Sequence, residues 1–176
     1  ELYRAHPYQR DLPDPPVIWT QGSSRLLDYG GAGRPVLLLP SLINRSYILD
    51  LSEGRSLVRW LAAQGLRPLV LDWGAPGAAE AAFDIEAYLH RARAALDHVA
   101  GQGGGPVGLV GYCMGGLLAL ALSLRVPAAV DRLALLATPW DFHAADHGDR
   151  RLQAGFASLT APYLQGSRAL PVDVIQ

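Results

Sequence analysis

The chain has 176 residues, of which 50% are hydrophobic, and its formal net charge at pH 7 is −1. This length and composition predict one globular domain with enough apolar residues for a core. All 15 basic residues are arginines scattered along the chain, which argues against a nucleic-acid partner. No apolar segment reaches the ~18 residues of a membrane span. The single cysteine excludes an internal disulfide and predicts a reducing, cytoplasmic environment.

The first part of the chain indicates short strands that alternate with helices. Residues 1–25 contain four prolines without a regular period, and we expect an extended N-terminal arm there. Strands are predicted over 26–29 and 36–39, and the second is apolar throughout, as in a strand covered on both faces. A helix is predicted over 55–64 and a further buried strand over 68–71.

The same alternation continues toward the C-terminus. A helix is predicted over 84–99, with Asp84 as its N-cap. A strand over 107–110 leads into a helix that ends near Leu124, and another strand follows over 133–137. Such alternation predicts an α/β protein with a mostly parallel sheet and helices on both faces.

The most informative motif is Gly-Tyr-Cys-Met-Gly-Gly over 111–116, at the predicted junction of a strand and a helix. It matches the G-x-S-x-G nucleophile elbow of α/β-hydrolases, with Cys113 in the position of the serine. The flanking glycines permit the strained turn that such an elbow requires. The alternative is that Cys113 is a small buried hydrophobe, as most lone intracellular cysteines are. Its place between glycines at this junction favours the nucleophile.

Two backbone amides are candidates for an oxyanion hole. Met114 N–H lies at the start of the predicted helix, where unpaired N–H groups and the helix dipole favour an anion, including a thiolate at Cys113. The second donor is expected from the loop after an earlier strand, and Leu42 N–H is our candidate. The alternative is an ordinary loop whose proline ends the strand. Ser41 lacks the flanking glycines of an elbow and is not a predicted nucleophile.

A thiol nucleophile needs a base, and the sequence offers His143 as a local candidate because it follows the strand after the elbow. In α/β-hydrolases the acid and the histidine come later in the chain, so we expect both beyond Gln176. Asp141 is a weaker candidate that either orients a histidine or serves as a loop carboxylate. Residues 103–108 match G-x-G-x-x-G but precede a strand, so no dinucleotide cofactor is predicted, and no metal-ligand spacing is present.

Five separated segments share the pattern of one family. They are 40–51, 56–61, 72–74, 111–116 and 138–142, in this order. Together they resemble the polyhydroxyalkanoate synthases, most closely the short synthases that work with an accessory subunit, and the similarity spans roughly 20–176. The resemblance implies an α/β-hydrolase fold that is truncated here before its late strands, with residues 26–176 as the N-terminal portion of the catalytic domain.

The resemblance also implies an activity. In that family a cysteine in this motif receives the acyl group of an (R)-3-hydroxyacyl-CoA, and the polyester grows as a thioester or bound alcohol. By resemblance Cys113 is that residue. The implied partners are the acyl-CoA, the growing polyester, an accessory synthase subunit and a second copy of the chain. The implied location is the cytoplasm, including the surface of polyester granules. The sequence departs from the family at Ser41–Leu42, where a second proline and an aromatic are often found.

Two other functions stay open on the sequence. A hydrolase of the same fold (a thioesterase, an esterase or a depolymerase) would keep the Cys113 elbow and release the acyl group to water. The chain would otherwise be a catalytically incomplete fragment or a scaffold. Residue 1 is Glu and Met114 is the only methionine, so we expect a piece of a longer protein. By itself this piece is expected to have little or no turnover, because a base is missing.

Overall fold

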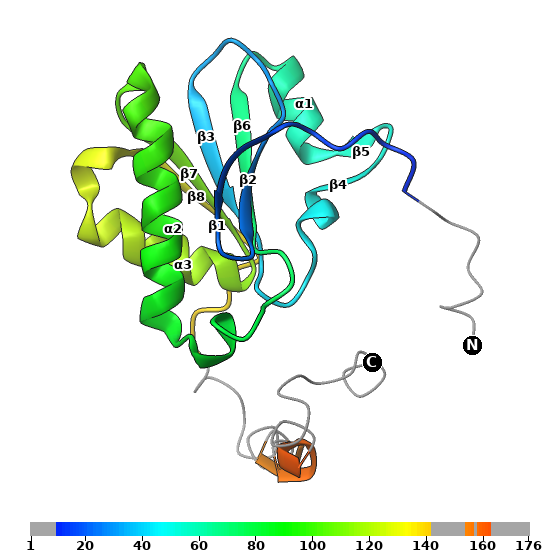
Figure 1. Ribbon diagram of the computed structural model, residues 1–176. Coiled ribbons are helices and arrows are strands. Elements are labelled where there is room, and N and C mark those ends of the chain that lie inside the picture. The colour runs from blue at the N-terminus through cyan, green and yellow to red at the C-terminus, as the bar shows by residue number, and fades with distance from the viewer. Residues whose placement is uncertain (1–9, 142–153, 157, 163–176) are drawn as a thin grey trace. The chain divides into compact units, whose positions relative to one another are not determined.

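The computed structural model describes residues 10–141, 154–156 and 158–162. Its contacts group the chain into two compact units, Glu1–Pro139 and Trp140–Gln176. The labelled strands and helices of Figure 1 all lie in the first unit. In the second unit, residues 154–156 and 158–162 are helical. The assignment of 26–176 to one catalytic domain therefore stays a prediction.

A sheet forms the centre of the first unit, and in the described residues its strand order is β1-β2-β6-β3-β7-β8 (Figure 1). The strands are β1 (Val17–Gln21), β2 (Ser24–Asp28), β3 (Pro35–Leu39), β6 (Arg67–Asp72), β7 (Val107–Tyr112) and β8 (Val130–Leu136). The pairs β6·β3, β3·β7 and β7·β8 are parallel, whereas β1·β2 and β2·β6 are antiparallel. The expected mostly parallel sheet is confirmed.

Helices cover both faces of this sheet, as predicted (Figure 1). They are α1 (Leu57–Ala63), α2 (Ile85–Val99) and α3 (Met114–Arg125). Because successive side chains of a strand point to opposite faces, Leu37 and Leu39 of β3 join the core with α2 and α3. Leu38 joins a second core cluster with Val58 of α1. None of the described helices combines the length and apolar composition that crossing a membrane needs.

The helix ends follow from local side-chain chemistry. Asp84 caps α2 as predicted, because its carboxylate accepts the N–H of Ala87 at 2.8 Å. Ser56 caps α1 in the same way through Arg59 N–H at 3.1 Å, so this helix begins at residue 57 rather than at 55. The short elements are η1 (Ser46–Leu49), β4 (Asp50–Ser52), β5 (Arg55–Ser56), η2 (Glu80–Ala82), η3 (Ala100–Gly104) and η4 (Pro127–Ala129).

For residues 17–25 the hairpin of β1 and β2 corrects the expectation of an extended arm over 1–25, whose first nine residues lie outside the described part of the chain. Residues 17–21 pair antiparallel with β2, which places them in the sheet. The prolines that suggested an arm end at Pro16, so none of them interrupts this ladder. Contacts distant in sequence hold the hairpin in place, because Arg91 of α2 donates to Gln21 O at 2.6 Å. Only the tertiary structure shows this pairing.

Asp50 is the buried centre of an ion-pair cluster beside α1. Its side chain is fully buried and accepts from Arg10 Nη2 at 2.6 Å, Arg59 Nε at 2.8 Å and Ser56 Oγ at 2.6 Å. Burial by itself would raise the pKa of the Asp50 carboxyl, but the hydrogen bonds from Arg59, Ser56 and Arg10 outweigh it and lower the pKa to about 2. The cluster ties Arg10, near the N-terminus, to the start of α1.

Replacing Asp50→Asn is expected to lower the free energy of unfolding at pH 7 by about 2–4 kcal/mol, because two arginines lose their buried partner. Because folding lowers the pKa of Asp50, the wild type has its full stabilisation at pH values above 3.8, the ordinary pKa of an aspartate. This stabilisation is lost as the pH falls toward 2. Urea unfolding followed by circular dichroism, repeated between pH 5 and 2, measures both effects.

The control is Asp97→Asn, which breaks an exposed ion pair with Arg93. This variant is expected to change the free energy of unfolding by less than about 1 kcal/mol. Equal effects of the two substitutions would show that the Asp50 cluster adds no more than a surface ion pair.

Candidate active site

Cys113 forms the sharp turn between β7 and α3. Its backbone has φ 52° and ψ −127°, a left-handed φ that is unfavourable for a residue with a side chain. The turn is held in place because Cys113 N–H donates to Leu136 O of β8 at 2.9 Å. Cys113 is partly buried, and its side chain does not cap α3. The sulfur is therefore not used for structural hydrogen bonding at the helix end.

Three glycines around Cys113 allow backbone segments to approach one another closely. A Cβ on Gly111 would overlap the Cα of Gly116. A Cβ on Gly115 would overlap the carbonyl oxygen of Leu39, and one on Gly116 would overlap the Thr138 hydroxyl. The start of α3 is therefore packed directly on the ends of β3 and β8, and larger residues would push it away.

Met114 is the first residue of α3, as the sequence predicts. The first N–H groups of a helix have no partner inside the helix, and they carry the positive end of its dipole. Gly116 N–H is already used, since it donates to Cys113 O at 2.9 Å. Among the described residues Met114 N–H has no hydrogen-bond partner, so it is an open donor beside the cysteine.

The loop after β3 comes next to this turn, because β3 and β7 are neighbours and Leu39 lies opposite Gly111. Ser41 is fully buried, and its hydroxyl accepts Ile43 N–H at 3.2 Å. Leu42 N–H makes no hydrogen bond to any residue that the structure describes. Of these neighbouring amides, Leu42 is the one that stays open for a ligand. Burial also makes Ser41 unsuited to act as a nucleophile.

Trp73 holds the same loop from the side of β6. Its indole N–H donates to Pro40 O at 3.0 Å, and its ring meets Tyr88 of α2 edge-on at 5.6 Å. Trp73 is only 8% exposed, and it also lines a cavity beside this loop. Sequence reasoning missed this tether, because it joins residues 33 positions apart.

Thr138, like Trp73, contributes to the structure around Cys113, and Thr138 was not singled out from the sequence. Its hydroxyl is buried, packs against Gly116 and finds no hydrogen-bond partner among the described residues. No sequence signal distinguishes it, since its contact with α3 arises only from the parallel pairing of β7 with β8.

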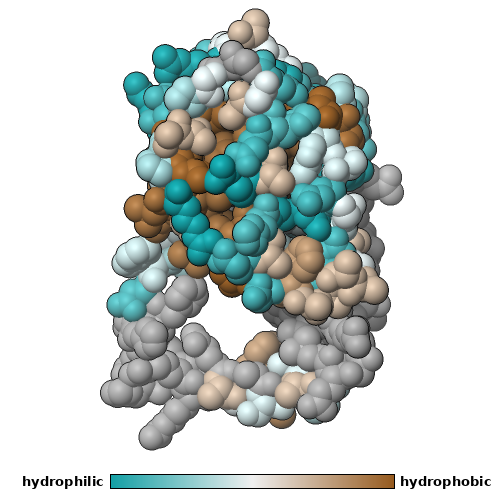
Figure 2. Space-filling model, turned by 60° about the vertical axis from the view of Figure 1, so that its left-hand side comes forward, coloured by the Kyte–Doolittle hydropathy of each residue, from teal (hydrophilic) through white to brown (hydrophobic). Residues whose placement is uncertain are grey.

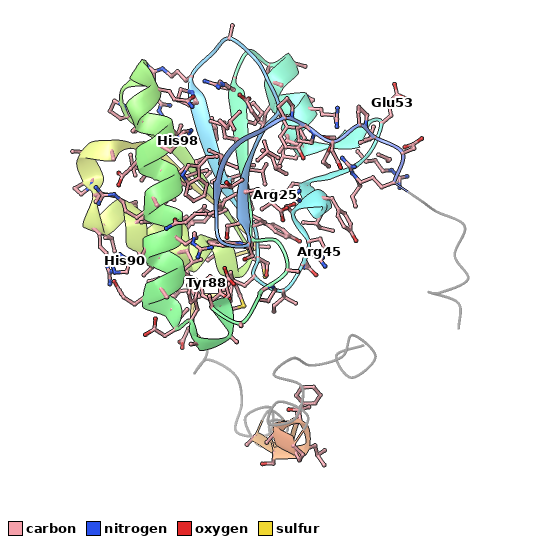
Figure 3. The ribbon with its side chains drawn as sticks, in the orientation of Figure 1. Arg25, Arg45, Glu53, Tyr88, His90 and His98 are labelled. Carbon is pink, nitrogen blue, oxygen red and sulfur yellow. The ribbon has the colours of Figure 1, made fainter. Side chains whose placement is uncertain are left out.

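The structure does not relate the candidate acid and base to Cys113. His143 falls in a segment that the structure does not describe, so its role stays a prediction. Asp141 belongs to the second unit and is exposed, and its role also stays a prediction. His90 and His98, labelled in Figure 3, are on α2, where they contact Glu86 and Gln102. In the described residues, no group of three or more acidic, histidine or cysteine side chains could hold a metal.

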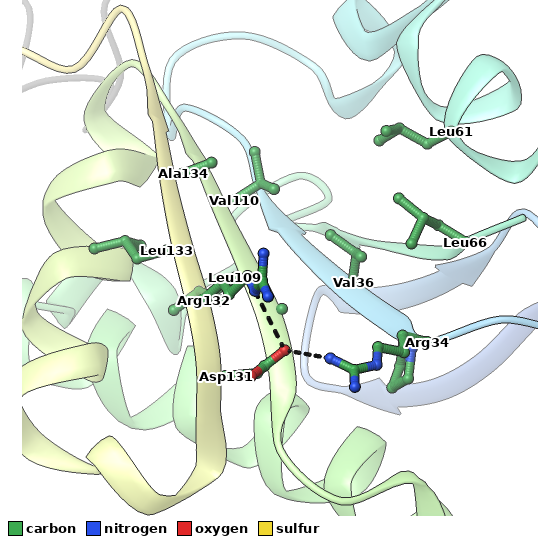
Figure 4. A pocket seen from close by; sticks show the side chains of 12 residues that line it. Arg34, Val36, Leu61, Leu66, Leu109, Val110, Asp131, Arg132, Leu133 and Ala134 are labelled. Carbon is green, nitrogen blue, oxygen red and sulfur yellow. Dashed lines mark hydrogen bonds and ion pairs between the residues drawn. The ribbon is translucent and has the colours of Figure 1, made fainter. Parts of the chain in front are cut away.

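Cavities occur at both ends of the sheet. One of about 210 Å³ lies beside Leu42, Trp73 and Gly74, where β3 and β6 end, on the same edge as Cys113. Another, of about 540 Å³, is shown in Figure 4. It includes Arg34 and Asp131, which form an ion pair of 2.8 Å near the starts of β3 and β8. In parallel sheets ligands bind at the carboxyl ends of the strands, so the smaller cavity is the better candidate.

The surface near β8 is partly apolar. Leu135 and Leu136 are 43% and 37% exposed on this strand, which is an edge of the described sheet. The face in Figure 2 likewise has a hollowed apolar area surrounded by hydrophilic side chains.

Comparison with known sequences gives two results. A family model described as alpha/beta hydrolase fold matches residues 34–166. The chain is also 34% identical over 128 residues to a poly(3-hydroxyalkanoate) polymerase subunit PhaC of Haloferax mediterranei, covering 69% of this chain and 26% of that protein. It is 36% identical over 121 residues to a poly(3-hydroxyalkanoate) polymerase of Methylorubrum extorquens, covering 64% and 20%. The resemblance to these polymerases is confirmed, and the chain spans about a quarter of their length.

Solved structures support the fold alone, since their sequence identities are low. A putative non-heme bromoperoxidase, BpoC of Mycobacterium tuberculosis, has a TM-score of 0.62 at 23% identity over 89% of this chain and 52% of its own. A monoglyceride lipase of Saccharomyces cerevisiae has a TM-score of 0.60 at 15% identity, covering 89% and 54%. A thioesterase domain from the curacin pathway has a TM-score of 0.56 at 17% identity, covering 86% and 59%.

Replacing Gly115→Ala is expected to destabilise the chain by about 1–3 kcal/mol, because the new methyl group would overlap the carbonyl groups of Leu39 and Pro40. Displacement of α3 should also slow the alkylation of Cys113. Gly101→Ala is the matched control, since nothing lies within 4 Å of its added Cβ. Urea unfolding and iodoacetamide kinetics measure the two effects, and a Gly115 variant as stable and reactive as the control would contradict the packing argument.

Proposed function

We propose that this chain, which belongs to the α/β-hydrolase fold family, carries the nucleophile of an acyltransferase that polymerises (R)-3-hydroxyacyl-CoA into polyhydroxyalkanoate. The observation that carries the proposal is the left-handed turn at Cys113, at the end of β7 and the start of α3. The similarity to poly(3-hydroxyalkanoate) polymerases supports the substrate class. The fold and the family similarity stand independently of this proposal.

In the first step the Cys113 thiolate attacks the carbonyl carbon of the acyl-CoA. A carbon–sulfur bond to the enzyme forms, and the carbonyl electrons move to its oxygen. The tetrahedral oxyanion accepts hydrogen bonds from Met114 N–H and Leu42 N–H, which have no partner among the described residues. Its collapse breaks the bond to CoA, which leaves as a thiolate. The product is an acyl thioester on Cys113.

In the second step the hydroxyl group of a hydroxyacyl chain attacks the thioester. A base removes the hydroxyl proton, a new ester bond forms, and the Cys113 thiolate is released. The base and its acid are proposed to lie beyond Gln176, with His143 and Asp141 as local alternatives. Transfer between CoA and a cysteine exchanges one thioester for another, so the relay is nearly balanced in free energy, unlike acylation of a serine.

The remaining parts of the proposal come from the resemblance. The chain would act in the cytoplasm and at polyester granules, together with an accessory synthase subunit and a second copy of itself. A hydrolase is the second candidate, since a chain named as a thioesterase domain shares the fold. The two activities differ only in the final acceptor, which is a hydroxyacyl chain in one case and water in the other.

Incubation of the protein at its natural length with (R)-3-hydroxybutyryl-CoA is expected to give insoluble polyester and free CoA. Cys113→Ala should lower CoA release by about 10³-fold or more, because no thioester can form. Cys113→Ser replaces the thiol with a hydroxyl of similar shape and should also be slow, since it holds the acyl group as an oxyester. Release of monomeric acid without polymer would support the hydrolase instead, and full activity of Cys113→Ala would refute both.

Alkylation tests the activation of the nucleophile separately from turnover. Iodoacetamide is expected to modify Cys113 in residues 1–176 faster than free cysteine at neutral pH, because the sulfur-bearing residue adjoins the positive end of the α3 dipole. The same piece should show little or no turnover of acyl-CoA. Alkylation no faster than free cysteine would remove the proposed activation, and robust turnover would place the base within this piece.

A further inference from the structure

Two cavities at the carboxyl edge of the sheet meet at one arginine. The loop cavity is the one of about 210 Å³ beside Leu42 and Trp73. The arginine cavity, of about 300 Å³, is lined by residues that include Arg10, Arg25 and Tyr47. Arg45 and Asp72 line both cavities. The two cavities therefore adjoin at these residues. Together they are called the groove, which extends from Leu42, the proposed oxyanion donor, toward β2.

The face of this groove follows from the periodicity of the strands. Val70 of β6 and Leu27 of β2 belong to the core cluster on the side of α1. Asp72 is two residues from Val70 on β6, and Arg25 is two residues from Leu27 on β2. The side chains of Asp72 and Arg25 therefore point to this same face. The groove thus runs from the carboxyl edge of β6 onto the α1 side of β2.

The charges of the groove are paired except at Arg45. Arg25 is bound to Asp72 at 2.6 Å, and Arg10 is bound to Asp50 at 2.6 Å and to Asp14 at 3.0 Å. The exposed side chain of Arg45 has no ion-pair or hydrogen-bond partner in the part of the chain that the structure describes. Its guanidinium group is an unused donor of several hydrogen bonds with a full positive charge, which suits a phosphate. Figure 3 labels both Arg25 and Arg45.

The length of the groove matches a pantetheine arm. Counting from β7, which carries Cys113, the next strands are β3, β6 and β2. Three strand spacings amount to about 14 Å. The pantetheine arm of CoA has about a dozen bonds between its sulfur and the diphosphate. Four extended residues of a polypeptide have about the same number of backbone bonds, so the arm also reaches about 14 Å. A thioester at Cys113 would therefore let the diphosphate reach the arginine cavity, which Arg45 lines.

We infer that Arg45 binds the diphosphate of acyl-CoA, while the pantetheine arm lies in the loop cavity and leads to Cys113. The inference rests on the proposed function for its ligand class and adds the path along which that ligand is held. Arg25 is neutralised by Asp72 and serves as a wall of the groove. Arg45 then acts in the selection of CoA thioesters over thioesters without phosphate.

Binding measured without acyl transfer tests this path. In a Cys113→Ala background, calorimetric titration is expected to show that CoA binds about tenfold more tightly than pantetheine, which has no diphosphate. Arg45→Met should remove this difference and leave pantetheine binding unchanged, whereas Arg45→Lys should keep part of it. The difference should also shrink as the salt concentration rises. Adenosine 3′,5′-bisphosphate and inorganic phosphate show whether a phosphate group alone suffices.

Arg55→Met is the matched control, because Arg55 is exposed and lines neither cavity. It should preserve the preference for CoA. A second measurement avoids substitution: CoA, but not pantetheine, should slow the modification of Arg45 by phenylglyoxal, read by peptide mass. Equal affinities of the wild type for CoA and pantetheine, no binding of CoA, or equal behaviour of the Arg45→Met and Arg55→Met variants would overturn the inference.

These outcomes are separate from the proposed function. Loss of the CoA preference in Arg45→Met, together with an absence of polymer, would leave the binding path standing and refute the polymerase. Polymer formation by a protein whose preference for CoA over pantetheine does not depend on Arg45 would support the polymerase and refute the binding path.

Discussion

The direct contact between the start of α3 and the ends of its neighbouring strands is the constraint on which the site depends. Gly115 lies against the Leu39 and Pro40 carbonyl groups, and Gly116 lies against Thr138. With any larger residue, α3 would move away from the sheet, and the turn at Cys113 would relax. The backbone strain of one residue is thus maintained by the absence of side chains at its neighbours.

Buried polar contacts then determine how the surrounding loops face this turn. Trp73 donates to the Pro40 carbonyl, and Ser41 accepts Ile43 N–H, whereas Leu42 N–H has no partner among the described residues. Further from the site, the Asp50 cluster fixes the segment that follows the same loop to α1. These interactions join residues from separate strands, and together they give the loop after β3 one conformation.

Much of the scaffold could be read from local patterns. The apolar run 36–39, the Asp84 cap and the glycine-flanked Cys113 each depend on neighbours within a few residues, and the structure has β3, the start of α2 and the sharp turn at these places. The strand predicted over 26–29 corresponds to β2, but the N-terminal hairpin that β2 forms with β1 could not be read in this way. Its prolines dominate the local signal, whereas Arg91 and the edge of β6 decide that residues 17–28 join the sheet.

The sequence by itself determined where the strands, the helix caps and the elbow occur, because periodicity, capping and glycine geometry act over short distances along the chain. Only the tertiary structure decided which groups stay open. In the described part of the chain Leu42 N–H has no partner, whereas the next amide is engaged by Ser41. Arg45 differs from Arg25 because Asp72 lies opposite Arg25 alone of these two. Such pairing depends on strand order and register, which bring together residues far apart in sequence.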